Sequence, residues 1–457
     1  MIIHRHLIFL LSLVFISCPV NLTAQEKNNK ESKKSPILQK VTPKALDLPS
    51  CYQISVQRSE SLGIRFQEYK AAEARYWQAV STIMPNLKFI AEERLQNNTF
   101  TSGSSTAGSP LNAGVAVGGG ATSNNPRNNA FTGRFNVTQP IFHGFRDFSL
   151  IAAQKAQTKA VDLDYRRALQ TFYYDVADVF YQIISYEQDL DLQYLLEKAL
   201  QERVKELSQR VEIGRSRKSE LLQAESQLAD SAVLIEQTKG LVVAAKELMA
   251  FLTGIPAGQF SLIDRQPIPS VEKLEDYLWK SGTRPDIEAA VQRQTAATKD
   301  LSARKGEFLP TVNLEANYYA VQDPTTDREW NVVITGEVPL FDGGLRINRV
   351  KEGKAALKES QLSLSQVLRS SQTEVRTSYH NFISSVNQYI KLDKAFKIAK
   401  ENYEVQKRDY ELGRSSNLDV LVSLSNLYET RRRYLNTELQ TKVNAISLQV
   451  AAGDIKE

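Results

Sequence analysis

The sequence predicts an internally duplicated α+β membrane protein, in which each copy supplies two membrane-crossing β-strands and a pair of long antiparallel α-helices. Two observations predict this class: motifs of the first half recur in the second half at a fixed spacing, and alternating apolar and polar segments precede long stretches without proline. Hydrophobic residues make up 42% of the 457 residues, charged residues make up 24%, and the mean hydropathy is −0.35. This composition excludes a bundle of membrane helices.

Residues 1–24 have the pattern of an export signal, with a polar start, an apolar stretch at Leu7–Ile16 and small residues before Gln25. We expect cleavage after Ala24. The alternative is lipidation of Cys18, because Phe15-Ile16-Ser17-Cys18 loosely resembles a bacterial lipobox. Residues 25–49 are rich in lysine and contain three prolines, which predicts a flexible periplasmic tail.

Charge and rare residues exclude several functions. The net charge is +5, but Arg5 and the six lysines and three acids of residues 25–50 supply 1 + 6 − 3 = +4 of it, so a nucleic-acid groove is not expected. With two cysteines and four histidines, neither a disulfide scaffold nor a histidine metal site is predicted, and Cys51 is expected to be a buried apolar residue. We predict no cofactor and no catalytic set, and we interpret His143 and His380 as structural residues.

The repeat is visible in three pairs of motifs. Pro140 lies in a segment similar to that around Pro339, and Gly214 in one similar to that around Gly413, at 339 − 140 = 413 − 214 = 199 residues. Near the start of each copy, Pro85 matches Pro310 at 225 residues, so the first copy holds 225 − 199 = 26 extra residues. These belong to a polar, glycine-rich loop within 96–129. The predicted repeats are 50–254 and 284–453, joined by a linker at 255–283.

Each copy has one pair of alternating segments, at 86–98 and 131–140 and again at 311–322 and 330–339. In the last of them, the apolar residues Trp330, Val332 and Ile334 face away from the polar residues Asn331, Thr335 and Glu337. Segments of about nine to eleven residues match tilted membrane strands. Four strands cannot close a barrel, so other copies of the chain must complete the sheet.

Long helices are predicted at 144–212 and 343–411, because neither stretch contains a proline after its first turn. At 1.5 Å per residue each helix is roughly 100 Å long. Each is expected to end at a glycine turn and to be followed by an antiparallel return helix, at 217–253 and 416–452. Shorter helices, Pro49–Ile83 and Arg284–Phe308, precede the strand pairs.

This order of elements behind an export signal resembles the TolC-like outer-membrane efflux protein family, the outer membrane factors. The resemblance rests on the junctions Gln139-Pro140-Ile141-Phe142 and Val338-Pro339-Leu340-Phe341-Asp342-Gly343-Gly344, the Arg284-Pro285-Asp286 start of the second copy, and the two glycine turns. It implies a homotrimer in outer-membrane lipid, with a 12-stranded barrel and a helical tunnel extending into the periplasm. It also implies a periplasmic adaptor (membrane fusion) protein and an inner-membrane pump as partners.

The resemblance further implies that the turns contact the adaptor. The implied contact residues are Gly214, Arg215, Ser216, Ser219, Leu221, Gly413, Arg414, Ser415, Leu418 and Leu421. A periplasmic gate is implied at Asp419, Val422 and Tyr410, where Asp419 either forms a carboxylate ring or only caps its helix with Ser416. The competing interpretations are a structural coiled-coil protein of the envelope and a periplasmic adaptor without channel activity.

Overall fold

The computed structural model describes residues 44–96, 128–321 and 329–455. The predicted export signal, Cys18 and most of the predicted loop at 96–129 lie outside these ranges. At the edges of that loop the structure corrects the sequence analysis, since Gln96, Asn128 and Asn129 belong to strands.

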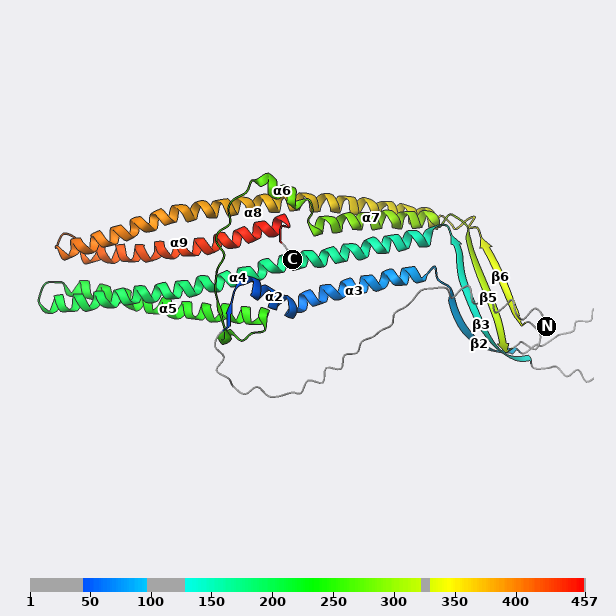
Figure 1. Cartoon of the computed structure of the whole chain (residues 1–457), viewed down its shortest axis with the longest axis horizontal. Helices are drawn as coiled ribbons and strands as arrows, with labels where there is room; N and C mark the ends of the chain where they lie inside the picture. The colour runs from blue at the N-terminus through cyan, green and yellow to red at the C-terminus, as the bar shows by residue number, and fades with distance from the viewer. Residues whose placement is uncertain (1–43, 97–127, 322–328, 456–457) are drawn as a thin grey trace, which may run out of the picture. The chain divides into compact units, whose positions relative to one another are not determined.

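Two helical hairpins of equal size dominate the fold (Figure 1). Helix α4 (Arg146–Glu212) and helix α8 (Leu345–Glu411) have 67 residues each, and the return helices α5 (Lys218–Thr253) and α9 (Asn417–Ala452) have 36 each. The hairpins lie side by side with their turns at the same end.

Shorter helices pack against the long ones. They are α2 (Leu48–Arg58), α3 (Glu60–Ser81), α6 (Leu274–Ser281) and α7 (Pro285–Gly306). The single helix expected at Pro49–Ile83 is wrong, because the chain leaves the helical conformation at Ser59, with φ −61° and ψ 111°. The Ser59 hydroxyl then accepts a hydrogen bond from the Leu62 amide at 3.3 Å and caps α3. None of the helices in the described ranges is long and apolar enough to cross a membrane.

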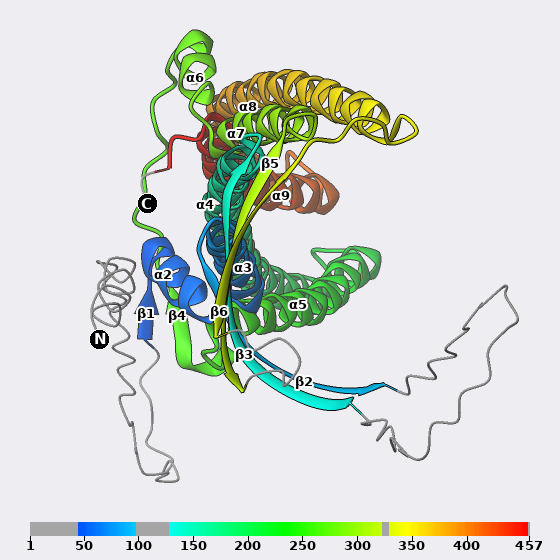
Figure 2. The same cartoon turned by 90° about the vertical axis from the view of Figure 1, so that its right-hand side faces the viewer.

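Four antiparallel strands form one curved sheet in the order β2-β3-β5-β6 (Figure 2). They are β2 (Asn86–Gln96), β3 (Asn128–His143), β5 (Thr311–Val321) and β6 (Trp330–Glu337). Strand β3 continues three residues past the predicted end at Pro140, because its pairing with β5 resumes after an irregularity between Pro140 and Phe142. Beyond it, His143 contacts Asp147 through Nδ1 (2.7 Å) and Asn313 through Nε2 (2.8 Å).

A second, two-stranded sheet corrects the predicted tail at 25–49. Strand β1 (Lys44–Leu46) pairs in parallel with β4 (Phe260–Leu262) in the linker, directly after the short 3-10 helix Ala257–Gln259. Leu46 and Phe260 are both buried in the largest apolar cluster. The end of the tail is therefore part of the folded protein, since burial of these two side chains stabilises its pairing with the linker.

In the largest cluster, α2, α5 and α9 pack around buried side chains from the middle of α4, including Val176 and Phe180. Cys51 lies in this cluster with no exposed area, which confirms the expectation of a buried apolar residue. Burial raises the pKa of its thiol to about 12, so it is not a reactive thiolate at neutral pH.

Candidate functional site

The two glycine turns have the same backbone geometry. Gly214 and Gly413 both have φ +72°, a left-handed conformation, and this confirms the predicted glycine turns. After each glycine the next amide closes the helix end, from Arg215 to the Arg210 carbonyl at 2.7 Å and from Arg414 to the Asp409 carbonyl at 2.8 Å. A Cβ at either glycine would meet no atom within 4 Å. Glycine is therefore required there by backbone conformation and not by space.

The return helices begin differently after the two turns. In the second turn, Ser416 caps α9: its hydroxyl accepts from the Asp419 amide at 3.3 Å, and the Asp419 carboxylate accepts from the Ser416 amide at 3.0 Å. This capping box confirms the capping role predicted for Asp419. The bonds from the Ser416 side chain and amide lower the pKa of Asp419. In the first turn no side chain caps α5, and the Ser216 hydroxyl donates instead to Glu220.

Most of the predicted contact residues lie at the surface of the turns. Exposed are Gly214, Arg215, Ser219, Gly413, Arg414 and Leu418, and half-buried are Ser216, Leu221 and Ser415. Leu421 is predicted as a contact residue, but its side chain has no exposed area in the chain. It lies on the face of α9 that packs inward. Its counterpart 199 residues earlier, Leu222, is 54% exposed and is an apolar surface residue that the sequence analysis missed.

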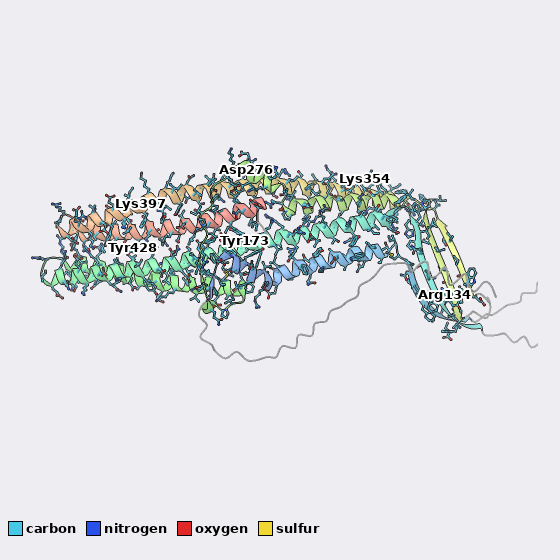
Figure 3. The ribbon with its side chains drawn as sticks, viewed as in Figure 1. Arg134, Tyr173, Asp276, Lys354, Lys397 and Tyr428 are labelled. Carbon is cyan, nitrogen blue, oxygen red and sulfur yellow. The ribbon has the colours of Figure 1, made fainter. Side chains whose placement is uncertain are left out.

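Leu421 belongs to an apolar cluster just behind the turns, which we call the tip cluster. Its buried members come from all four long helices: Leu200, Leu207, Ala224, Tyr410, Val420, Leu421 and Leu424. Tyr403 and Tyr428 pack against it, and Figure 3 labels Tyr428 on this part of the hairpins. The tip cluster therefore holds the two hairpins together next to their turns.

A buried arginine crosses from one hairpin to the other. The Arg203 guanidinium on α4 lies over the Tyr410 ring at 3.9 Å, and its Nε donates to Asn417 Oδ1 at 2.9 Å. Asn417 has no exposed area and donates to the Glu220 carbonyl at 3.3 Å, so one network joins all four helices. Arg203 and Asn417 could not be predicted as site residues from the sequence, because no local pattern reveals contacts over about two hundred residues.

Of the three predicted gate residues, only Tyr410 is part of this network. Tyr410 is 8% exposed between Arg203 and Arg210, whereas Val422 is 48% exposed and Asp419 lies at the surface of α9. Within one chain, Tyr410 therefore joins the two hairpins, whereas Asp419 and Val422 lie on an exposed face of α9.

Two helical hairpins that continue into a four-stranded sheet define the class of outer-membrane channels with a helical tunnel. The family described as "Outer membrane efflux protein" matches residues 52–254 and 282–454. The chain belongs to this family.

Relatives and solved structures agree with that assignment. "Outer membrane protein TolC" of Vibrio cholerae is 22% identical over 339 residues, covering 70% of this chain and 76% of the relative. "Protein CyaE" of Bordetella pertussis is 24% identical over 323 residues, covering 68% of each chain. The crystal structure of VceC from Vibrio cholerae has a TM-score of 0.75 at 18% identity, covering 89% of this chain and 96% of that one. A crystal structure of CusC has a TM-score of 0.75 at 17% identity, covering 89% and 92%.

Proposed function

We propose that three copies of the chain form an exit channel in the outer membrane, through which an efflux or type I secretion system passes its substrates to the exterior. Membership in the outer membrane efflux protein family supports the channel and its location. The name of one relative, the cation efflux system protein CusC of Escherichia coli, supports the use in efflux.

The two faces of the sheet carry the proposal. The paired register places apolar side chains on one face: Leu87, Phe89, Phe135, Val137, Leu314, Ala316, Tyr318, Trp330, Val332 and Ile334. Most of them are exposed in the single chain, up to 71% for Ile334. On the other face Asn136 donates to Glu315 and Asn317 at 2.8 Å each. Such a sheet is suited to have lipid on one side and water on the other.

Among the described strands, β2 and β6 are the outer ones of this sheet and each has one edge without a neighbour. Unpaired backbone groups are costly in lipid, so these edges require further strands. Three copies supply 3 × 4 = 12 strands, which exceeds the roughly eight of the smallest known barrels. A structural coiled-coil protein or an adaptor has no use for this sheet.

The turns are proposed as the contact with a periplasmic adaptor, which links the channel to an inner-membrane pump. The exposed glycine turns carry arginines at 215 and 414 and an apolar side chain at Leu418. Because the arginines are exposed, an adaptor surface with carboxylates at matching positions fits them best.

The same end of the hairpins is proposed to contain the gate. In the closed channel, Arg203 and Tyr410 hold the hairpins together, and the surface of α9 with Asp419 and Val422 lines the entrance. A ring of Asp419 carboxylates from three copies would favour cations, in addition to the capping role of each carboxylate.

The experiment that tests the function uses the full chain purified from outer membranes in mild detergent. We expect a trimer by cross-linking and mass measurement, and discrete conductance steps after insertion into planar bilayers. A chain that remains monomeric in membrane fractions, or a trimer without conductance, would overturn the proposal.

A further inference from the structure

The strand pairs β2–β3 and β5–β6 have the same register once the repeat spacing is applied. Within the first hairpin, Asn86 pairs with Thr138 and Lys88 with Asn136. Adding 225 to the β2 number and 199 to the β3 number gives Thr311 with Glu337 and Asn313 with Thr335, which are pairs of the second hairpin. The spacing therefore transfers strand pairing from one repeat to the other.

One pairing in the chain has no counterpart within it. Strand β3 of the first repeat pairs with β5 of the second, whereas β6, the counterpart of β3, has no neighbour on that side. The counterpart of β5 is β2, which is the other edge. Only a second copy of the chain can place a β2 beside β6.

The segment directly after β6 is more exposed than the matching segment of the first repeat, as expected of a surface that a second copy covers. In the first repeat, Phe142 and His143 are half-buried, and Gly144 is buried against the end of α7. In the second repeat, Phe341, the counterpart of Phe142, is 90% exposed, and Gly343, the counterpart of Gly144, is also exposed, whereas Asp342 is half-buried like its counterpart His143. Two similar sequences differ in exposure because only the first is covered by β5 and α7 in its own chain.

The polar contact at the end of β3 also has a complementary counterpart. His143 bridges Asp147, four residues later, and Asn313 on β5. By the same spacings, His143 corresponds to Asp342, Asp147 to Arg346 and Asn313 to Lys88. Asp342 already contacts Arg346 at 3.5 Å, as His143 contacts Asp147.

The remaining partner is Lys88, which is exposed and has no ion pair with another described residue. The long histidine and short asparagine of one junction are replaced by a short aspartate and a long lysine at the other. At both junctions one long and one short side chain together span the distance between the two strand backbones. At the second junction the two side chains also have opposite charges.

The helices above the sheet have the same complementarity. Within one chain, Leu163 on α4 of the first repeat is buried with Ala289 on α7 of the second. Their counterparts are Leu362 on α8 and Ile64 on α3, which are 59% and 61% exposed. These two side chains would bury each other if α3 of a neighbouring copy packed on α8 as α7 packs on α4.

In the proposed 12-stranded barrel, β6 of one copy lies beside β2 of the next. We infer that this pairing places Val338 opposite Phe89 and that Asp342 forms an ion pair with Lys88 of the neighbouring copy. The register follows from Gln139 opposite Leu314 in the β3–β5 pair. The inference rests on the proposed oligomeric channel and specifies the residue contacts that join its subunits.

Cysteine cross-linking in the intact, detergent-solubilised oligomer tests the register. In a Cys51→Ala background, Val338→Cys with Phe89→Cys should give covalent dimers and trimers after oxidation with copper phenanthroline, and reductant should reverse them. The matched control is the β3–β5 pair Gln139→Cys with Leu314→Cys, which should cross-link within one chain only. Each single cysteine should give no cross-link.

A pair shifted by one residue distinguishes this register from its neighbours. Glu337→Cys with Phe89→Cys places the thiols on opposite faces of the sheet and should cross-link at least tenfold less. If the shifted pair reacts faster, or if an intact trimer gives no cross-link for the aligned pair, the inferred register is wrong while the channel proposal stands. If the unmodified chain is monomeric, both fail.

A double-mutant cycle tests the ion pair. Lys88→Gln and Asp342→Asn should each lower the temperature at which the oligomer dissociates, and the double variant should lower it no further than the larger single effect. Lys218→Gln, at an exposed lysine of the first turn, should leave that temperature unchanged. Additive effects of the two changes would refute the ion pair even if the cross-link forms.

Discussion

Gly413 has an unusual combination of a left-handed backbone and open space around its missing side chain. A valine there would clash with nothing, but its branched Cβ is unfavourable at φ +72°. We expect Gly413→Val to destabilise the turn by about 2 kcal/mol, since the left-handed conformation costs about 1–2 kcal/mol for a residue with a Cβ.

Because the turn lies outside the sheet, the Gly413→Val protein should still form the oligomer but should lose export in cells. Gly240, in the middle of α5, also has open space around it but has an ordinary helical backbone. Gly240→Val is therefore the matched control and should export normally. Normal export by Gly413→Val would contradict the role of this turn in docking.

Asp419 is expected to stabilise the start of α9 in a pH-dependent way. Its pKa is lowered in the folded chain by the bonds from Ser416, so its contribution is fully present above the pKa of an unfolded aspartate. That contribution is lost as the pH falls through the lowered pKa. The protection of the amides in the first turn of α9, measured as exchange relative to the intrinsic rate at each pH, should therefore fall below about pH 4.

The Asp419→Asn variant should show fast exchange at that turn throughout this pH range. Cation selectivity of single channels separates the two roles of the residue. If selectivity is unchanged in Asp419→Asn, the carboxylate acts only as a helix cap and the proposed ring is absent.

At the scale of elements, the Arg203 network is the principal polar link of α4 to the α8–α9 hairpin near the turns. We expect Arg203→Ala to weaken this link, because it removes the cation above Tyr410 and leaves buried Asn417 without its donor. The closed state should open more often, so single-channel conductance or open probability should rise severalfold.

Arg210→Ala is the control for that prediction, because Arg210 also lies over the Tyr410 ring, at 4.9 Å, but makes no contact with Asn417. Its effect should be clearly smaller. Equal effects would show that the cation above the ring matters and the bond to Asn417 does not.

An element could be predicted from the sequence when a short stretch of the chain contains the residues that determine it. The long helices were predicted within two residues at every end, because missing prolines and the glycine turns are local features. The break at Ser59 was not predicted, because the residues on both sides favour helix. Only the hydrogen bond from the Leu62 amide to the Ser59 hydroxyl reveals that a new helix begins there. The pairing of β1 with β4 was missed because each strand has three residues and their partners are far apart in the chain.

The candidate site was predicted unevenly for the same reason. The conformations of Gly214 and Gly413 and the Ser416–Asp419 box follow from short motifs. The burial of Leu421 does not, because its counterpart Leu222 at the same repeat position is exposed. Tertiary contacts decide which of two equivalent leucines lies inside.

At the scale of the whole chain, the repeats are alike in sequence but unequal in burial. Helices α4 and α8 have 67 residues each, yet 18 residues of α4 are buried and only 7 of α8. Helix α4 packs against α2, α3 and α7, whereas α8 packs against α6 and α7. One chain thus completes only part of the contacts that its duplicated sequence can make.

The uncovered half of the chain has a kinetic consequence. A newly exported subunit carries free strand edges and apolar rows until it meets other copies, so its lifetime as a single chain is set by collision and not by its own folding rate. The final step of maturation should therefore be of higher order in protein concentration, and dilution should slow it without slowing formation of the helices. A cell that makes too little of the protein would lose assembled channels more than proportionally, and the single chains would be the form exposed to periplasmic proteases.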